Sequence, residues 1–170
     1  MNPVLYILMR NDVASLTVGR QMAQASHAAS AIASRMERLG RQIPENRNIG
    51  VNRTIAYECW LDWVRSTRQT SIVSPNNYSQ GFGTTIVLSV SEKEMRDTIA
   101  VALVARSQEK SFTAGIITDP TYAVKDGDIA HIVSLDTCGY ILGDRDSEAL
   151  KLLTQDFKLA GEDTPPWREV

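Results

Sequence analysis

A change of hydrophobic period near the N-terminus constrains the fold more than any other feature of the sequence. Residues 4–9 (VLYILM) form a continuous apolar run, which is typical of a strand buried on both faces. From Val18 onward the apolar residues recur with the period of an α-helix and fall within one sector of about 100°. The sector holds Met22, Ala25, Ala29, Ile32, Met36 and Leu39. A buried strand that leads into an amphipathic helix predicts an α/β fold.

The same two patterns alternate along the rest of the chain. Thr17 and Gly40 suit the two ends of the first helix, and Ser91 has the capping-box spacing to Glu94. We predict strands over residues 4–9, 85–90, 112–118 and 129–135, and helices over residues 18–39, 54–68, 91–108 and 147–159. The sequence therefore predicts one domain over residues 1–160, a three-layer αβα sandwich with a four-stranded mixed sheet.

Two segments look like additions to this domain. Residues 69–83 (QTSIVSPNNYSQGFG) are rich in Pro, Asn, Ser and Gly, which predicts an inserted surface loop that is long for a compact domain. Residues 161–170 (GEDTPPWREV) are expected to form a loose C-terminal tail.

Composition excludes several classes of protein. The chain has 170 residues, 43% of them hydrophobic, which is enough for one core but not for two large domains. No apolar run approaches the roughly 18 residues of a membrane span, and we find no signal-peptide pattern. Two cysteines favour a reducing, cytoplasmic location. The spacing of Cys59, Cys138, His27 and His131 matches no common zinc pattern, so we expect no metal and no cofactor.

The charge is divided unevenly between the two halves of the sequence. Residues 1–85 hold nine arginines, no lysine and five acidic residues, a net charge of +4. Residues 86–170 hold nine basic and fifteen acidic residues, a net charge of −6. A basic half can meet a polyanion locally, although the arginines can equally be solvated residues on helix surfaces.

Three polar residues of the first helix form a candidate binding face. Arg20, Gln24 and His27 are spaced i, i+4, i+7, and this row lies about 160° from the centre of the apolar sector. Their guanidinium, amide and imidazole groups recognise polar ligand atoms. The helix begins at the carboxyl edge of the sheet, where open α/β sheets bind ligands. The alternative is that Gln24 and His27 bridge to neighbouring backbone.

Asp119 is a second candidate. It ends the third predicted strand, so it reaches the same edge as the first helix if the first and third strands are parallel. The alternative is an aspartate that initiates a turn before Pro120.

Two segments also match a known pattern. LYILMRND over residues 5–12 is followed by GRQMAQASHAA over residues 19–29. They resemble the opening of the archaeal/eukaryotic-type (type II) peptidyl-tRNA hydrolases, in which a strand ends in Arg-x-Asp and the first helix carries Ala-Gln-x-Ser-His-Ala. The order of the later elements fits as well, and the resemblance covers about residues 3–136.

The resemblance implies an enzyme that hydrolyses the ester between a peptide and the 3′ end of tRNA without a cofactor. The implied catalytic residues are Arg20, His27, Asp119 and Tyr122, and the implied substrate-binding residues are Arg10, Gln24 and Ser26. The resemblance also implies a cytoplasmic protein that binds tRNA, forms a homodimer and has no membrane partner.

Three positions depart from the family pattern. Arg20 stands where the family has a lysine, and Tyr122 and Ala130 align with two threonines. Arginine keeps the charge but does not shuttle a proton, and loss of one stabilising donor can lower a rate by about two to three orders of magnitude. The alternative function is therefore a catalytically weakened relative that acts as a tRNA- or protein-binding module.

Overall fold

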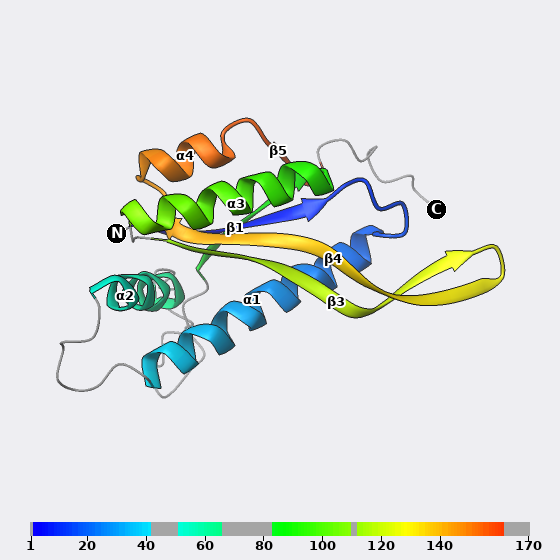
Figure 1. Ribbon diagram of the computed structural model, residues 1–170, viewed down its shortest axis with the longest axis horizontal. Coiled ribbons are helices and arrows are strands. Elements are labelled where there is room, and N and C mark those ends of the chain that lie inside the picture. The colour runs from blue at the N-terminus through cyan, green and yellow to red at the C-terminus, as the bar shows by residue number, and fades with distance from the viewer. Residues whose placement is uncertain (1, 42–50, 66–82, 110–111, 162–170) are drawn as a thin grey trace, which may run out of the picture.

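The computed structural model describes residues 2–41, 51–65, 83–109 and 112–161 (Figure 1). In chain order its elements are β1 (Pro3–Arg10), α1 (Val18–Arg41), α2 (Val51–Arg65), β2 (Thr84–Val90), α3 (Glu92–Glu109), β3 (Thr113–Asp126), β4 (Ile129–Asp144), α4 (Glu148–Thr154) and β5 (Lys158–Leu159). This arrangement confirms the predicted mixed α/β class. The predicted loop 69–83 up to residue 82, and the predicted tail beyond residue 161, lie outside the described residues.

The sheet is open and mixed, with the strand order β3-β4-β1-β2-β5. β1 and β2 are parallel, whereas β4 is antiparallel to both of its neighbours, β1 and β3. β1 and β3 therefore run in the same direction, as the candidate site requires. The prediction of four strands is wrong, because β5 pairs with β2 through Leu88–Leu159 and Ser89–Lys158. Two residues are too few to leave a hydrophobic period, so the pattern predicted a longer helix there.

Helices cover both faces of this sheet (Figure 1). Val4 and Leu8 of β1 belong to the core under α3 and α4, and Leu5 and Ile7 belong to the core under α1 and α2. Alternate residues of β1 thus serve two cores, which explains why the whole strand is apolar. The predicted four-stranded sandwich is replaced by an open five-stranded sheet with helices on both faces.

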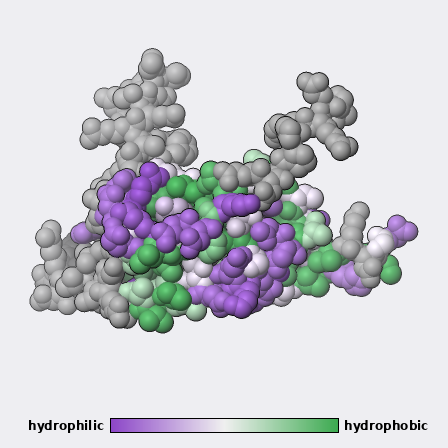
Figure 2. Space-filling view, turned by 90° about the horizontal axis from the view of Figure 1, so that it is seen from above, coloured by the Kyte–Doolittle hydropathy of each residue, from purple (hydrophilic) through white to green (hydrophobic). Residues whose placement is uncertain are grey.

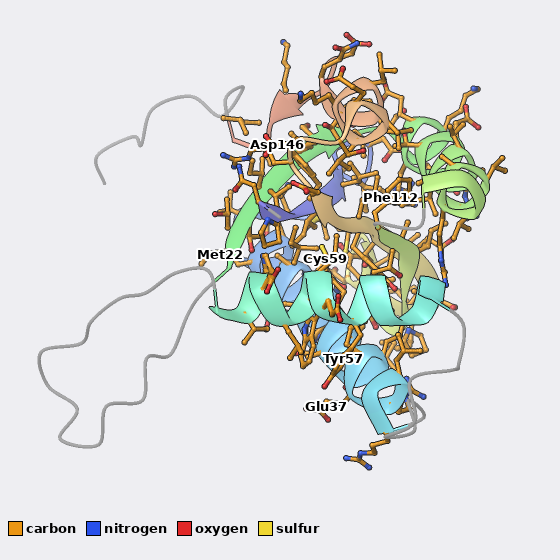
Figure 3. All side chains as sticks on the ribbon, turned by 90° about the vertical axis from the view of Figure 1, so that its left-hand side faces the viewer. Met22, Glu37, Tyr57, Cys59, Phe112 and Asp146 are labelled. Carbon is orange, nitrogen blue, oxygen red and sulfur yellow. The ribbon has the colours of Figure 1, made fainter. Side chains whose placement is uncertain are left out.

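α2 begins and ends three residues earlier than predicted, and its aromatic side chains pack against the core that α1 also covers. In Figure 3, Cys59 lies on the side of α2 that faces the sheet, and Tyr57 lies between α2 and α1. A Cβ atom at Gly40 of α1 would lie 2.7 Å from the Tyr57 ring, so a larger residue there would require this ring to shift. Trp63 donates its indole N–H to the carbonyl oxygen of Thr84 at 2.8 Å.

The capping box predicted at Ser91 is present. The Ser91 backbone N–H donates to Glu94 Oε2 at 2.7 Å, and the Glu94 N–H donates to Ser91 Oγ at 3.3 Å. α4 is shorter than the predicted helix over 147–159, and Ser147 caps it by accepting from the Leu150 N–H.

β3 and β4 are much longer than predicted, at 14 and 16 residues. β3 continues through Asp119 and Pro120, past register shifts on both sides of this pair. A proline usually ends a strand, but here it lies in an irregular stretch where the ladder is already interrupted. Residues 122–134 project beyond the rest of the sheet as a two-stranded ribbon, which we call the arm (Figure 1). Gly127 turns the arm with φ of 58°, a conformation that favours glycine.

The face formed by α3 and α4 carries a mixed surface. Figure 2 shows hydrophobic residues interrupting the hydrophilic ones on this side of the molecule. The exposed apolar residues of these two helices are Val101, Leu103, Val104 and Leu152. Among the described residues, no helix is long and apolar enough to span a membrane.

Candidate functional site

The buried face of α1 overlaps the predicted one, because Ile32 and Met36 are buried and Ala25 and Leu39 pack against the same core, but it is shifted toward Gln24. Its buried residues are Gln24, Ala28, Ile32 and Met36, whereas Met22 is 70% exposed. The expectation that Gln24 faces away from the core is therefore wrong. An amide can be buried when its polar atoms are hydrogen-bonded, and the sheet supplies partners for both ends of this one.

The Gln24 amide connects α1 to two strands. Its Nε2 donates to Asp119 Oδ2 of β3 at 2.8 Å, and its Oε1 accepts from Thr137 Oγ1 of β4 at 2.8 Å. An ionised carboxylate can only accept, so the NH₂ end of the amide must face Asp119. The oxygen end therefore faces His27, whose Nδ1 lies 3.4 Å away. Nδ1 of His27 must then carry the proton in this contact, which leaves Nε2 of the neutral ring as an acceptor.

Asp119 is held by its own turn as well as by Gln24. Its Oδ1 accepts from the Thr121 backbone N–H at 2.9 Å and from Thr121 Oγ1 at 3.2 Å. The turn considered as an alternative and the contact with α1 therefore occur together. The Thr121 N–H is the main cause that lowers the pKa of Asp119; partial burial opposes it, and the Gln24 amide adds to it. Asp119 is an anion at neutral pH.

Arg20 lines the same depression as Asp119 but bonds to backbone. Its Nη1 donates to the carbonyl oxygens of Ser15 at 3.2 Å and of Ala123 at 2.9 Å. The guanidinium carbon lies 5.3 Å from the centre of the Tyr122 ring, a cation–π distance. Tyr122 itself is 3% exposed, and its hydroxyl lies 3.1 Å from Ser15 Oγ. The Tyr122 ring thus packs against the Arg20 guanidinium, while the Tyr122 hydroxyl bonds to Ser15 and not to the Asp119 carboxylate.

These groups line one open depression with a volume of about 210 Å³. Its lining residues are Arg20, Ala23, Gln24, His27, Asp119, Thr121, Tyr122 and Ala123. The structure thus brings together residues of α1 and β3 that lie about 95 positions apart in the sequence. The depression thus contains the Asp119 carboxylate, the Arg20 guanidinium, the His27 imidazole and the Thr121 hydroxyl. Such a set of groups can bind a polar ligand and orient a water molecule.

Other predicted site residues lie elsewhere. Ser26 is exposed on α1 and does not line the depression. Ala130 pairs with Lys125 in the arm, five residues before Leu135, which pairs with Asp119. At roughly 3.3 Å per strand residue, Ala130 lies about 17 Å further out along the arm.

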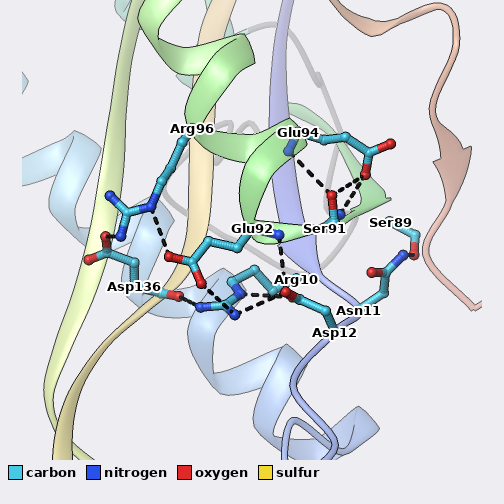
Figure 4. A network of polar contacts seen from close by, with 9 residues as sticks. All are labelled: Arg10, Asn11, Asp12, Ser89, Ser91, Glu92, Glu94, Arg96 and Asp136. Carbon is cyan, nitrogen blue, oxygen red and sulfur yellow. Dashed lines mark hydrogen bonds and ion pairs between the residues drawn. The ribbon is translucent and has the colours of Figure 1, made fainter.

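Arg10 belongs to a separate polar network at the end of β1 (Figure 4). Only 6% exposed, it donates to both carboxylate oxygens of Asp12 and to the carbonyl oxygen of Asp136, and it forms an ion pair with Glu92. Arg96 bonds to Glu92 and to the Asp136 carboxylate. The guanidinium of Arg10 is thus surrounded by acceptors of the protein, which indicates a structural role.

Neither cysteine is activated, and the described residues form no metal site. Cys59 and Cys138 are free and buried, and burial raises the pKa of Cys59 to about 11 and that of Cys138 to about 12. Both thiols are therefore protonated at neutral pH and are poor nucleophiles. Within the described ranges, no group of three or more His, Cys, Asp or Glu side chains could hold a metal ion.

Sequence reasoning missed two threonines of the site. Thr121 could have been found, because a threonine two residues after an aspartate commonly donates back to its carboxylate. Thr137 gives no local signal, since its hydroxyl reaches Gln24 only through the register of β4 against β3.

The fold and the site together define a mixed α/β protein with a polar depression between its first helix and an edge strand of the sheet. No family model matches the chain, and no curated protein matches it.

Proposed function

We propose that this protein hydrolyses the ester bond of peptidyl-tRNA and releases free tRNA and peptide. The observation that carries the proposal is the contact between Gln24 of α1 and Asp119 of β3 in a depression that also holds Arg20 and His27. These four residues are among the seven that the resemblance to type II peptidyl-tRNA hydrolases marks as functional.

In the proposed reaction Asp119 orients the attacking water. Its lowered pKa keeps it ionised, and each carboxylate oxygen has lone-pair capacity beyond the bonds from Thr121 and Gln24. His27 lines the same depression, so a water bound there can reach its imidazole. Because Nδ1 of His27 faces Gln24, its Nε2 is the nitrogen that can accept the proton of that water.

Arg20 supplies the positive charge of the proposed site. Both of its bonds to backbone use Nη1, so in the described part of the chain the N–H donors on Nε and Nη2 remain for a ligand. They can polarise the ester carbonyl or hold the terminal phosphate of the acceptor end. Tyr122 assists by supporting the guanidinium with its ring.

The charge distribution supports tRNA as the partner. The arginine-rich half of the sequence includes α1, whose last turn carries Arg38 and Arg41. Contacts of this kind neutralise phosphates, so recognition would follow the shape of the acceptor stem more than its sequence. As the resemblance suggests, we also propose that the protein is cytoplasmic and forms a homodimer.

Two observations favour the alternative, a binding module without strong catalysis. Arg20 is fixed by two carbonyl oxygens and cannot serve as the proton donor that the lysine of the family could be. A carboxylate with a lowered pKa is also a weak base. The same depression would then hold the end of tRNA without cleaving it.

Release of peptide from diacetyl-lysyl-tRNA by the purified protein tests the proposal. We expect Asp119→Asn to lower the rate at least 100-fold while tRNA binding persists, because the variant loses the anion that orients water. Asp97→Asn is the control, since Asp97 pairs with Lys93 on the exposed surface of α3 and does not touch the depression.

The other outcomes separate the alternatives. If wild type and Asp119→Asn are equally slow and both bind tRNA, the protein is a binding module. If neither binds tRNA, both ideas fail and a role in protein interaction remains. Cleavage of small esters without dependence on tRNA would indicate a different hydrolase on this scaffold.

A further inference from the structure

The arm exposes an apolar strand to solvent. All six β4 residues from Ile129 to Ser134 are exposed, with Ile129 and Ile132 each at 63%. Hydrophobic residues show on the projecting arm in Figure 2. The β3 strand of the arm packs Tyr122 and Val124 against the core under α1, but the β4 strand has no such cover. Strands in water gain stability from a third strand or a helix that buries their apolar side chains. An exposed apolar ribbon of this kind is therefore typical of an interaction surface.

One edge of the arm is open for pairing. β1 pairs with β4 only over residues Cys138–Asp144 of β4, whereas β3 also pairs with the part of β4 that lies in the arm. Residues 129–135 therefore have β3 on one side and, among the described residues, no strand on the other. Such an edge is a template for a further strand.

The two outer edges of the sheet, unlike the open edge of the arm, have features that hinder pairing with a further strand. On β3, the carbonyl oxygens of Ala114 and Ala123 accept from Arg35 and Arg20, and Pro120 interrupts the strand. On the other side of the sheet, β5 has only two residues. Charged side chains, prolines and short strands are the usual means by which proteins prevent unwanted edge pairing. The open edge of the arm carries none of them.

The sequence of this edge suits pairing with itself. Residues 129–135 (IAHIVSL) contain no Asp, Glu, Lys or Arg. An antiparallel pair centred on Ile132 would place Ile132 opposite the partner's Ile132, Ile129 opposite the partner's Leu135 and His131 opposite the partner's Val133. The central pair and the Ile129–Leu135 pairs are then apolar, and no like charges are opposed within residues 129–135, which favours cross-strand pairing over this segment. Asp128 would lie opposite the partner's Asp136, so the pairing ends at residues 129 and 135. The lack of Lys and Arg disfavours nucleic acid as the occupant.

We propose that the arm pairs with the arm of a second copy of this chain, through antiparallel contact of residues 129–135 about a two-fold axis at Ile132. The two arms then form one four-stranded ribbon, and the same surface of each copy is used twice, as in most soluble dimers. This interface rests on the arm alone and does not require the hydrolase activity.

The oligomeric state of the full-length protein, measured by sedimentation velocity, tests the proposal. We expect wild type to sediment as a dimer of its 18.8 kDa chain. Ile132→Lys should be monomeric at the same concentration, because it places two ammonium groups opposite each other. Leu152→Lys is the matched control: Leu152 is 67% exposed on α4, and this variant should remain dimeric.

A mixing experiment distinguishes loss of the interface from loss of folding. Ile132→Asp should also be monomeric by itself, but an equimolar mixture of Ile132→Lys and Ile132→Asp should recover dimers, since the two charges then attract across the axis. A monomeric wild type overturns the proposal and leaves a strand of another protein as the occupant. Unchanged dimerisation of Ile132→Lys, or no recovery on mixing, places the interface elsewhere and overturns it as well.

Discussion

At the scale of single residues, one buried hydroxyl helps to hold the site together. Thr137 is fully buried and donates to Gln24 Oε1, which anchors the amide whose direction is set by the Asp119 carboxylate. The amide direction in turn places the His27 proton on Nδ1. The Thr137 hydroxyl therefore influences the imidazole without touching it.

Thr137→Val should change the protonation of His27. Without the hydroxyl, Gln24 Oε1 keeps only the long contact with His27, so we expect the free energy of unfolding to fall by about 1 kcal/mol. The amide is then held by Asp119 alone, so its oxygen can move away from His27, and the His27 proton should spread to Nε2. Nitrogen-15 NMR of the two histidines measures this, with exposed His131 of the arm as internal reference.

Thr154→Val is the control for that experiment. Thr154 is also buried, and its hydroxyl donates to the Leu150 carbonyl oxygen within α4. This variant should lose similar stability and leave the His27 spectrum unchanged. Equal changes of the His27 spectrum in both variants would contradict the proposed influence of Thr137.

At the scale of elements, the sequence predicts what depends on local pattern. The helix start at Ser91 and the buried strand β1 follow from spacing alone, and both are present. The arm could not be predicted in this way, because the sequence Asp119-Pro120 is typical of the end of a strand. In the structure, β3 instead continues past this point through a bulge. Likewise, Met22 belongs to the apolar sector of α1 but is exposed in the structure. Gln24 is buried instead, because its hydrogen-bond partners lie on the sheet. Long-range contacts of this kind leave no periodic signal.

Gly143→Ala should destabilise the packing of β4 against the loop before β3. A Cβ atom there would lie 2.7 Å from the Cβ of Phe112, which is buried and close to its own backbone, so it cannot move easily. We expect the free energy of unfolding to fall by about 1–3 kcal/mol. Gly19→Ala in α1 is the control, since nothing lies within 4 Å, and it should raise stability by up to about 1 kcal/mol. Urea denaturation checks both, and equal midpoints for the two variants would contradict this account.

At the scale of the whole molecule, the network around Arg10 connects parts of the fold that the candidate site also uses. It joins β1, the start of α3 and β4 at Asp136, the residue directly before Thr137 (Figure 4). Thr118, the residue directly before Asp119 in β3, donates its hydroxyl to the side-chain carboxylate of Asp136. The network is therefore positioned to hold the root of the arm and the two strands that supply the site.

Arg10→Met should destabilise the whole fold in a manner that depends on pH. The variant leaves the Asp12 and Glu92 carboxylates and the Asp136 carbonyl oxygen together without their cation. Because these carboxylates are more than one-third exposed, we expect a loss of about 2 kcal/mol at pH 7 rather than the larger cost of a fully buried pair. Lys93→Met is the control: its ion pair with Asp97 is exposed, and its loss should leave the urea midpoint nearly unchanged.

The sign of the pH effect follows from Asp12. The hydrogen bond from Arg10 is the main cause that lowers the pKa of Asp12. A carboxyl group with a lowered pKa in the folded state stabilises the protein above its unfolded pKa, about 3.9, and this contribution is lost as the pH falls through the lowered value. Arg10→Met lacks this contribution at every pH, so the difference in unfolding free energy between wild type and variant should shrink when urea titrations are repeated from pH 6 down to pH 3. A difference that stays constant over that range would show that Arg10 stabilises the fold through packing of its aliphatic part instead of through its charge.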